Sequence, residues 1–99
     1  MMKGMKSMEV RVQVNLTVMP AEKHLAEMWS AANLLTDDRK SVRVSIPSDE
    51  PMSMVAAFTI PKARQMDVVD KIMRTFSLFM DDYGDQTVWF PKEPRKGSP

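Results

Sequence analysis

Hydrophobic and polar residues alternate along the first part of the chain in a pattern typical of a half-buried strand. Between residues 10 and 18 every second position is Val or Leu, and the positions between them are Arg, Gln, Asn and Thr. A period of two places the apolar residues on one face of a sheet and the polar residues on the other. We therefore expect a strand over 10–18 with one buried face and one open face.

Shorter stretches of the same alternation cover 42–46, 54–60 and 86–90. The proline-bounded acidic stretch 47–51 predicts a hairpin loop between the first two of them, because proline ends a ladder and acidic residues favour turns. The chain therefore offers four strands. In the third strand the positions predicted to face the core are Met54, Ala56, Phe58 and Ile60.

Two longer stretches, 21–35 and 62–83, have the period of an amphipathic helix. Gly84 is well placed to end the second helix in a left-handed conformation, and acid-first spacing predicts ion pairs from Asp67 to Lys71 and from Asp70 to Arg74. The first apolar stripe consists of Ala21, Leu25, Met28, Trp29, Ala32 and Leu35. The second, wider one consists of Met66, Val69, Ile72, Met73, Phe76, Phe79, Met80 and Tyr83 and is extended by Val68.

The order of these elements is β-α-β-β-α-β, which predicts an α+β two-layer sandwich with two helices on one face of a four-stranded antiparallel sheet. This order resembles the ferredoxin-like fold. The resemblance covers about residues 8–91 and implies the strand order 4-1-3-2 with right-handed crossovers. We expect one domain over 8–91, a flexible segment over 1–7 and a flexible tail over 92–99.

Composition narrows the function classes. The net charge of +1 gives no overall attraction for nucleic acid or for acidic membranes, and the 99 residues contain no cysteine. Disulfides, thiol nucleophiles and thiolate metal sites are therefore excluded. No stretch has the roughly 20 apolar residues of a membrane span, and the start lacks the apolar core of a secretory signal. We expect a cytoplasmic protein that does not bind membranes.

Candidate catalytic and metal-binding residues are few. His24 is the only histidine, and it has no carboxylate to orient it as a general base, since Glu22 and Glu27 lie on other sides of the first helix. We expect His24 to lie half-exposed at the edge of that helix. Asp81, Asp82 and Asp85 cluster around a glycine, but their spacing does not match a calcium-binding EF-hand loop. We assign no catalytic residue, no metal site and no cofactor.

The open face of the predicted sheet is the better candidate for a binding surface. It mixes small apolar groups, hydroxyls, amides and one large aromatic ring, which suits pairing with a second copy or lining a small-ligand site. Leu78 lies among charged residues of the second helix and is expected to be exposed. The candidate ligand or interface residues are Arg11, Gln13, Asn15, Arg43, Ala57, Leu78 and Trp89.

Three functions remain open from the sequence. The first is a small non-enzymatic domain that works as a homodimer and binds a small ligand or a protein partner. The second is a small enzyme of a dimeric ferredoxin-like type, acting on an apolar substrate with the help of Arg11, Asn15, His24 and Trp89. The third is a nucleic-acid-binding regulatory protein that uses Arg11, Arg43 and the basic tail. It is disfavoured because the two central strands carry no stacking aromatic residue.

Overall fold

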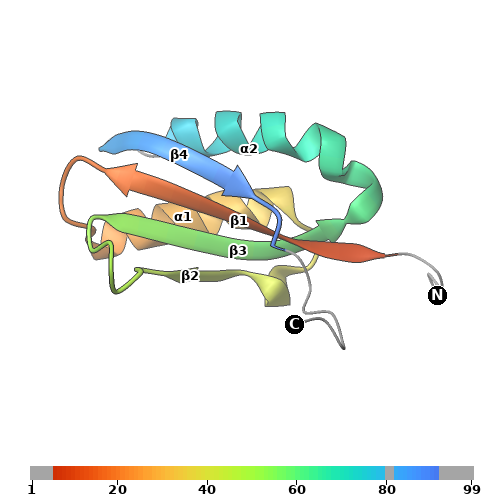
Figure 1. Cartoon of the computed structure of the whole chain (residues 1–99), viewed down its shortest axis with the longest axis horizontal. Coiled ribbons are helices and arrows are strands. Elements are labelled where there is room, and N and C mark those ends of the chain that lie inside the picture. Colours follow the sequence, from red (N-terminus) through yellow and green to blue (C-terminus); the bar gives the residue numbers. More distant parts are fainter. Residues whose placement is uncertain (1–5, 80–81, 92–99) are drawn as a thin grey trace.

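The computed structural model describes residues 6–79 and 82–91 of the chain (Figure 1). Two single turns of 3-10 helix, at Arg39–Ser41 and Lys62–Arg64, precede β2 and α2. None of the helices in the described residues is long and apolar enough to cross a membrane. The main elements are β1 (Ser7–Leu16), α1 (Glu22–Leu35), β2 (Arg43–Ser45), β3 (Ser53–Pro61), α2 (Gln65–Phe79) and β4 (Tyr83–Trp89).

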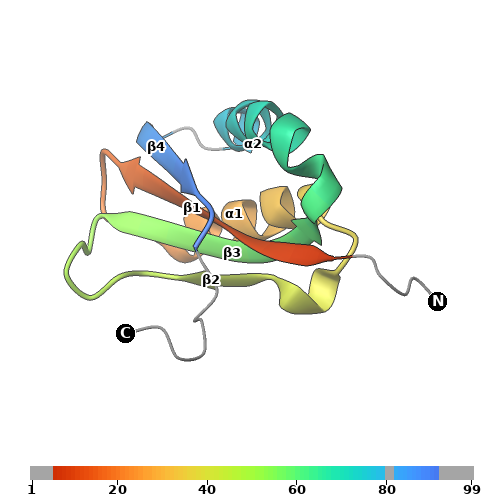
Figure 2. The ribbon, with the colours of Figure 1, turned by 45° about the vertical axis from the view of Figure 1, so that its right-hand side comes forward.

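The described residues form a four-stranded sheet in the order β2-β3-β1-β4, and every neighbouring pair of strands is antiparallel. Both helices pack on one side of this sheet. In Figure 1 α1 lies behind β1 and β3, and α2 runs beside β4; the rotated view in Figure 2 shows the same two layers. The predicted α+β architecture, an antiparallel sheet with two helices, is therefore confirmed.

The core lies between the helices and the inner face of the sheet. Val10, Val12 and Val14 of β1 have no exposed surface at all, as the strict alternation of this strand predicts. Removing such side chains from water contributes roughly 1.5–3 kcal/mol each. The other buried apolar residues are Leu16, Met28, Ala31, Ala32, Leu35, Met54, Ala56, Phe58, Ile60, Val68, Ile72 and Phe76.

The first strand ends earlier than predicted. The strand ends at Leu16, whose backbone N–H donates to Met52 O (2.9 Å), and the N–H of Thr17 donates to Asp82 O (2.8 Å). Val18, predicted to face the core, is therefore 40% exposed. At its other end β1 starts at Ser7. Residues 1–5 and the predicted tail 92–99 lie outside the described residues.

Both helices occupy their predicted places, and each turns its predicted stripe to the sheet, although some positions of the stripe remain exposed. In α1 the indole of Trp29 is 50% exposed, and Ala31 is buried in its place. In α2 the buried positions are Val68, Ile72 and Phe76, whereas Met66 is 89% exposed. The predicted apolar arc was wider than the contact, so it did not define which part of the arc touches the sheet.

The second helix is also shorter than the predicted range 62–83. Residues 62–64 form the 3-10 turn, and the backbone is already in β4 from Tyr83. Gly84 therefore does not end a helix, and its φ lies outside the left-handed region. It lies where the pairing of β1 with β4 shifts register after Asn15. A Cβ at this position would stand 2.9 Å from the carbonyl oxygen of Asn15, so the glycine is needed for close approach of two backbones.

Candidate functional site

The register of the sheet places four of the predicted site residues in one row. Ala57 of β3 pairs with Arg43 of β2 on one side and with Arg11 of β1 on the other, and Arg11 in turn pairs with Trp89 of β4. Directly paired residues of antiparallel strands share a face of the sheet. The row Arg43–Ala57–Arg11–Trp89 therefore crosses all four strands on the face opposite the helices, which is turned to the viewer in Figure 1.

This row is charged, accessible and only weakly neutralised. Both arginines are exposed, and Ala57 and Trp89 are half-buried. The Nε atom of Arg11 lies 3.3 Å from a carboxylate oxygen of Glu9, in an ion pair that water screens on both sides. Arg43 forms no ion pair with any residue that the structure describes. The row thus presents two guanidinium groups on either side of a small residue, next to an indole ring.

A network of hydrogen bonds lies beside this row and contains the other two residues predicted on the open face. Asn15 accepts a bond from the Ser53 hydroxyl (2.6 Å) at its Oδ1 atom and donates from Nδ2 to Asp85 (2.6 Å). The Gln13 amide donates to the same Asn15 oxygen (3.2 Å) and to Glu50. These bonds join β1, β4 and the loop before β3, and they orient both amide groups.

Ser53 was not predicted as part of this surface. It lies opposite Asn15 on the open face, yet only 5% of it is exposed. The period of two in β3 does place Ser53 on this face. A serine at the start of a strand, however, is common in turns and does not by itself indicate a site. Its burial depends on the side chains from β1, which the sequence of β3 does not reveal.

Leu78 is not brought together with these residues. It belongs to α2, which packs on the other face of the sheet, and its side chain lies outside the described residues. The structure therefore unites six of the seven predicted site residues on one face and separates the seventh from them.

His24 is buried, which corrects the prediction that it is half-exposed. Only 3% of it is accessible, and both ring nitrogens have partners. Nδ1 accepts the backbone N–H of Ala21 (2.9 Å), and Nε2 lies 3.0 Å from Asp82 Oδ2. Because Nδ1 is an acceptor, the proton of the neutral ring is on Nε2 and is donated to the carboxylate.

This arrangement ties the start of α1 to the segment between α2 and β4. His24 occupies the third position of α1. Its ring caps the helix by accepting the backbone N–H of Ala21, the residue just before the helix, as Glu or Gln does in a capping box. Neither ring nitrogen is free to take a proton from a substrate. The geometry therefore gives His24 a structural role.

The acidic cluster around Gly84 is divided in the structure. Asp82 is bonded to His24 and Asp85 to Asn15, while Asp81 lies outside the described residues. Among the described residues no group of three His, Asp or Glu side chains is placed to hold a metal ion. Asp82 and Asp85 therefore act as hydrogen-bond acceptors that hold β4 to α1 and β1.

A comparison with solved structures finds a likeness in fold. No protein-family model matches the chain, and no curated protein matches it significantly. The chain is similar to the crystal structure of protein SO0527 from Shewanella oneidensis, with 14% sequence identity and a TM-score of 0.46. The match covers 88% of this chain and 92% of that protein.

Proposed function

We propose that this protein is a small non-enzymatic binding domain that works as a homodimer and receives a small ligand or a protein partner on its open sheet face. The observation that carries this proposal is the row Arg43–Ala57–Arg11–Trp89, which crosses the whole sheet on a face that no helix of the described residues covers. A row of two cations, a small residue and an aromatic ring combines charge recognition with apolar contact.

The composition of the open face supports pairing with a second copy. Val55 and Ala57 lie next to each other along β3, both half-buried, and Thr59 and Thr87 add methyl and hydroxyl groups beside them. Interfaces between proteins typically have such a mixed composition, with an apolar centre and a polar rim. Two sheets that pack face to face stand about 10 Å apart, so the guanidinium groups of the row would lie between the two copies.

A binding role fits the geometry of the chain better than a catalytic one. The enzyme alternative included His24 among its site residues, and both ring nitrogens of His24 are occupied by Ala21 and Asp82. Arg11, Asn15 and Trp89 lie on the open face, whereas His24 belongs to α1 on the other side of the sheet. These residues do not converge on one reacting group.

We further infer that the topology is the ferredoxin-like one. The strand order β2-β3-β1-β4 reads 4-1-3-2 from the opposite edge, and antiparallel pairing throughout supports this assignment. Dimers of two-layer folds can form through the sheet face that the helices leave free, because that face is the larger unpartnered surface.

Light scattering coupled to size-exclusion chromatography tests the proposal. At tens of micromolar we expect twice the 11.3 kDa mass of the chain. Val55→Lys places a charge in the middle of the open face and should give a monomer. Met66→Lys, a matched change at an exposed position of α2, should leave the dimer intact. A monomeric wild type would overturn the homodimer, and a dimer that tolerates Val55→Lys would exclude the open face as its interface.

A further inference from the structure

A small pocket lies on the helical side of the molecule, away from the open face. It is formed where the end of α1 meets the start of α2, and it has a volume of about 50 Å³. Since an apolar cavity of roughly 150 Å³ holds one benzene ring, this space holds only one or two heavy atoms of a ligand, and the rest of the ligand would lie at the rim of the pocket. The residues that line the pocket are Leu34, Leu35, Arg64, Asp67, Val68 and Lys71.

The apolar part of the pocket is already assembled. Leu35 and Val68 are 9% and 4% exposed and come from the two helices. Leu34 is 69% exposed beside them, so a large apolar side chain stands at the rim without cover from the described residues. A short hydrocarbon tail that covered Leu34 would remove the apolar surface of this side chain from water, which is favourable.

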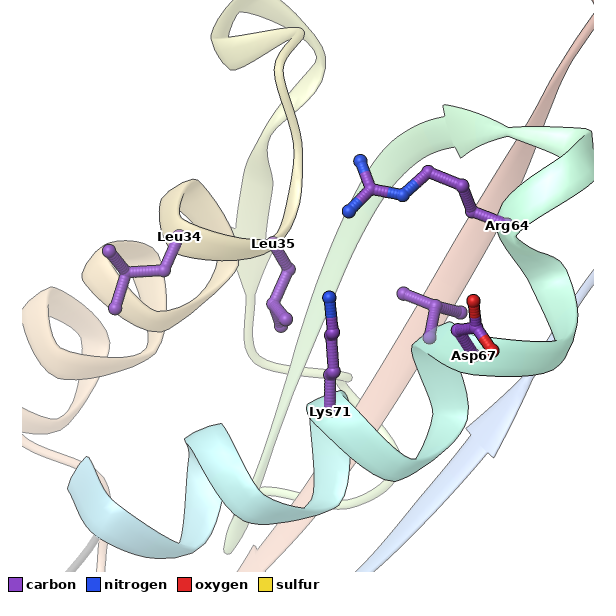
Figure 3. A pocket seen from close by; sticks show the side chains of 6 residues that line it. Leu34, Leu35, Arg64, Asp67 and Lys71 are labelled. Atoms are coloured by element: carbon purple, nitrogen blue, oxygen red, sulfur yellow. The ribbon is translucent and has the colours of Figure 1, made fainter.

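Two cationic groups meet above this apolar part. Figure 3 shows the guanidinium of Arg64 and the ammonium of Lys71 extending into the space between the helices, next to Leu35. The ion pair predicted between Asp67 and Lys71 is absent, and neither cation forms an ion pair with a carboxylate of the described residues. The other predicted pair does form, since Arg74 lies 3.1 Å from Asp70.

We propose that this pocket binds a short-chain carboxylate. The carboxylate would lie between Arg64 and Lys71, and its branched tail of three or four carbons would lie on Leu34 at the rim of the pocket. A guanidinium can hold both carboxylate oxygens at once, and an ammonium adds a third charge-assisted hydrogen bond. Asp67 at the rim disfavours a dianion such as phosphate, and the exposed Leu34 favours a ligand with a tail.

The same chemistry occurs in a free acid and at the carboxyl terminus of a peptide that ends in Leu or Val. A free acid and a peptide end would both place a carboxylate and an apolar tail at this pocket. The experiment distinguishes these two sources. This site is independent of the open sheet face, so failure of one proposal leaves the other untouched.

Nuclear magnetic resonance titration of the ¹⁵N-labelled full chain with sodium isovalerate, at constant ionic strength, tests the proposal. We expect saturable shifts of the backbone amides of Leu35, Val68 and Lys71, with a dissociation constant of about 1–10 mM for so small a ligand. Arg64→Gln and Lys71→Gln should each weaken binding by about fivefold or more. Arg74→Gln removes one positive charge from α2 outside the pocket and should leave binding unchanged.

Two further arms identify the source and the role of the charge. Isoamyl alcohol has the same tail without the carboxylate and should give no saturable shifts. A tetrapeptide that ends in leucine is compared in its free-acid and amidated forms, and binding of only the free acid, tighter than isovalerate, would assign the site to peptide ends.

Three outcomes would overturn the proposal. Shifts that rise linearly with concentration, or that sodium chloride reproduces, would show no specific site. Equal weakening by Arg74→Gln would show general electrostatic attraction. Loss of stability in Arg64→Gln and Lys71→Gln without any binding to the wild type would show that the two cations only stabilise the carboxyl-terminal end of α1.

Discussion

The two faces of β1 have opposite properties over the same few residues. On the inner face Val10, Val12 and Val14 are completely excluded from solvent, whereas on the open face Arg11 is exposed and Gln13 is half-buried. The inner side chains contribute to stability through burial and close packing. The outer ones gain less from burial, so the guanidinium of Arg11 remains available for contacts with another molecule. On the proposed function, stability and recognition are thus divided between two sides of one sheet.

The largest effect is expected on the inner face. Phe58 of β3 is 1% exposed and is among the largest fully buried side chains. Phe58→Ala leaves a cavity between β3 and the helices and should lower the free energy of unfolding by about 3–5 kcal/mol. Urea unfolding followed by circular dichroism measures this change.

A matched substitution on the open face sharpens the comparison. Val55 lies on the same strand and is half-buried. Val55→Ala should lower the free energy of unfolding of the monomer by less than about 1 kcal/mol, because fewer methyl contacts are lost. Equal costs at positions 55 and 58 would contradict the division of roles between the two faces.

An intermediate effect is expected at the one buried histidine. His24→Ala leaves the N–H of Ala21 and the carboxylate of Asp82 without this partner and should cost about 1–3 kcal/mol in the free energy of unfolding. His24→Gln is the matched control, because a glutamine at this helix position can still cap Ala21. This variant should recover part of the lost free energy of unfolding, but it should show no coupling to Asp82.

A double-mutant cycle with Asp82→Asn isolates the contact. His24 and Asp82 should show a coupling energy of about 0.5–1.5 kcal/mol in the lower part of the usual range, since about a third of the Asp82 side chain is exposed. Additive effects would exclude an energetic link between the start of α1 and the segment before β4.

The smallest effect on stability is expected at Trp89. It stands on the open face opposite Arg11, and a cross-strand pair contributes about 0.2–1 kcal/mol. Trp89→Ala should therefore unfold almost as the wild type does, yet weaken the dimer at least about tenfold, because large aromatic residues dominate interfaces. Analytical ultracentrifugation measures the dimer constant, with Met73→Ala on α2 as the control. An unchanged dimer constant would place Trp89 outside the interface.

Much of the fold could be predicted because its strands follow a strict period of two. In β1 and β3 each alternation identified the buried residues, and only Val18, beyond the end of β1, was assigned to the wrong environment. The phase of α2 could not be predicted in the same way. Its apolar arc was wider than one contact, and methionine occurs both in cores and on surfaces. Met66 and Met73 therefore looked equivalent to Val68 and Ile72.

The arrangement of the open face could be predicted only in part. Alternation assigned Arg11, Gln13 and Asn15 to this face, but only the register could show that Arg43, Ala57 and Trp89 share one row with Arg11. The contact of His24 with Asp82 joins residues 58 positions apart and has no local signal. Ion pairs and hydrogen bonds over such separations depend on how the layers meet, which pattern alone does not specify.

Gly84 has a consequence for anyone who maps tolerance to substitution along this chain. It lies on the surface, where most positions accept many residues, yet any side chain there would meet the carbonyl of Asn15. A saturation screen would therefore mark position 84 as intolerant, right beside Asp85 and Asn15 of the candidate binding surface. That signal would imitate a ligand contact, although its origin is the clearance between two strands.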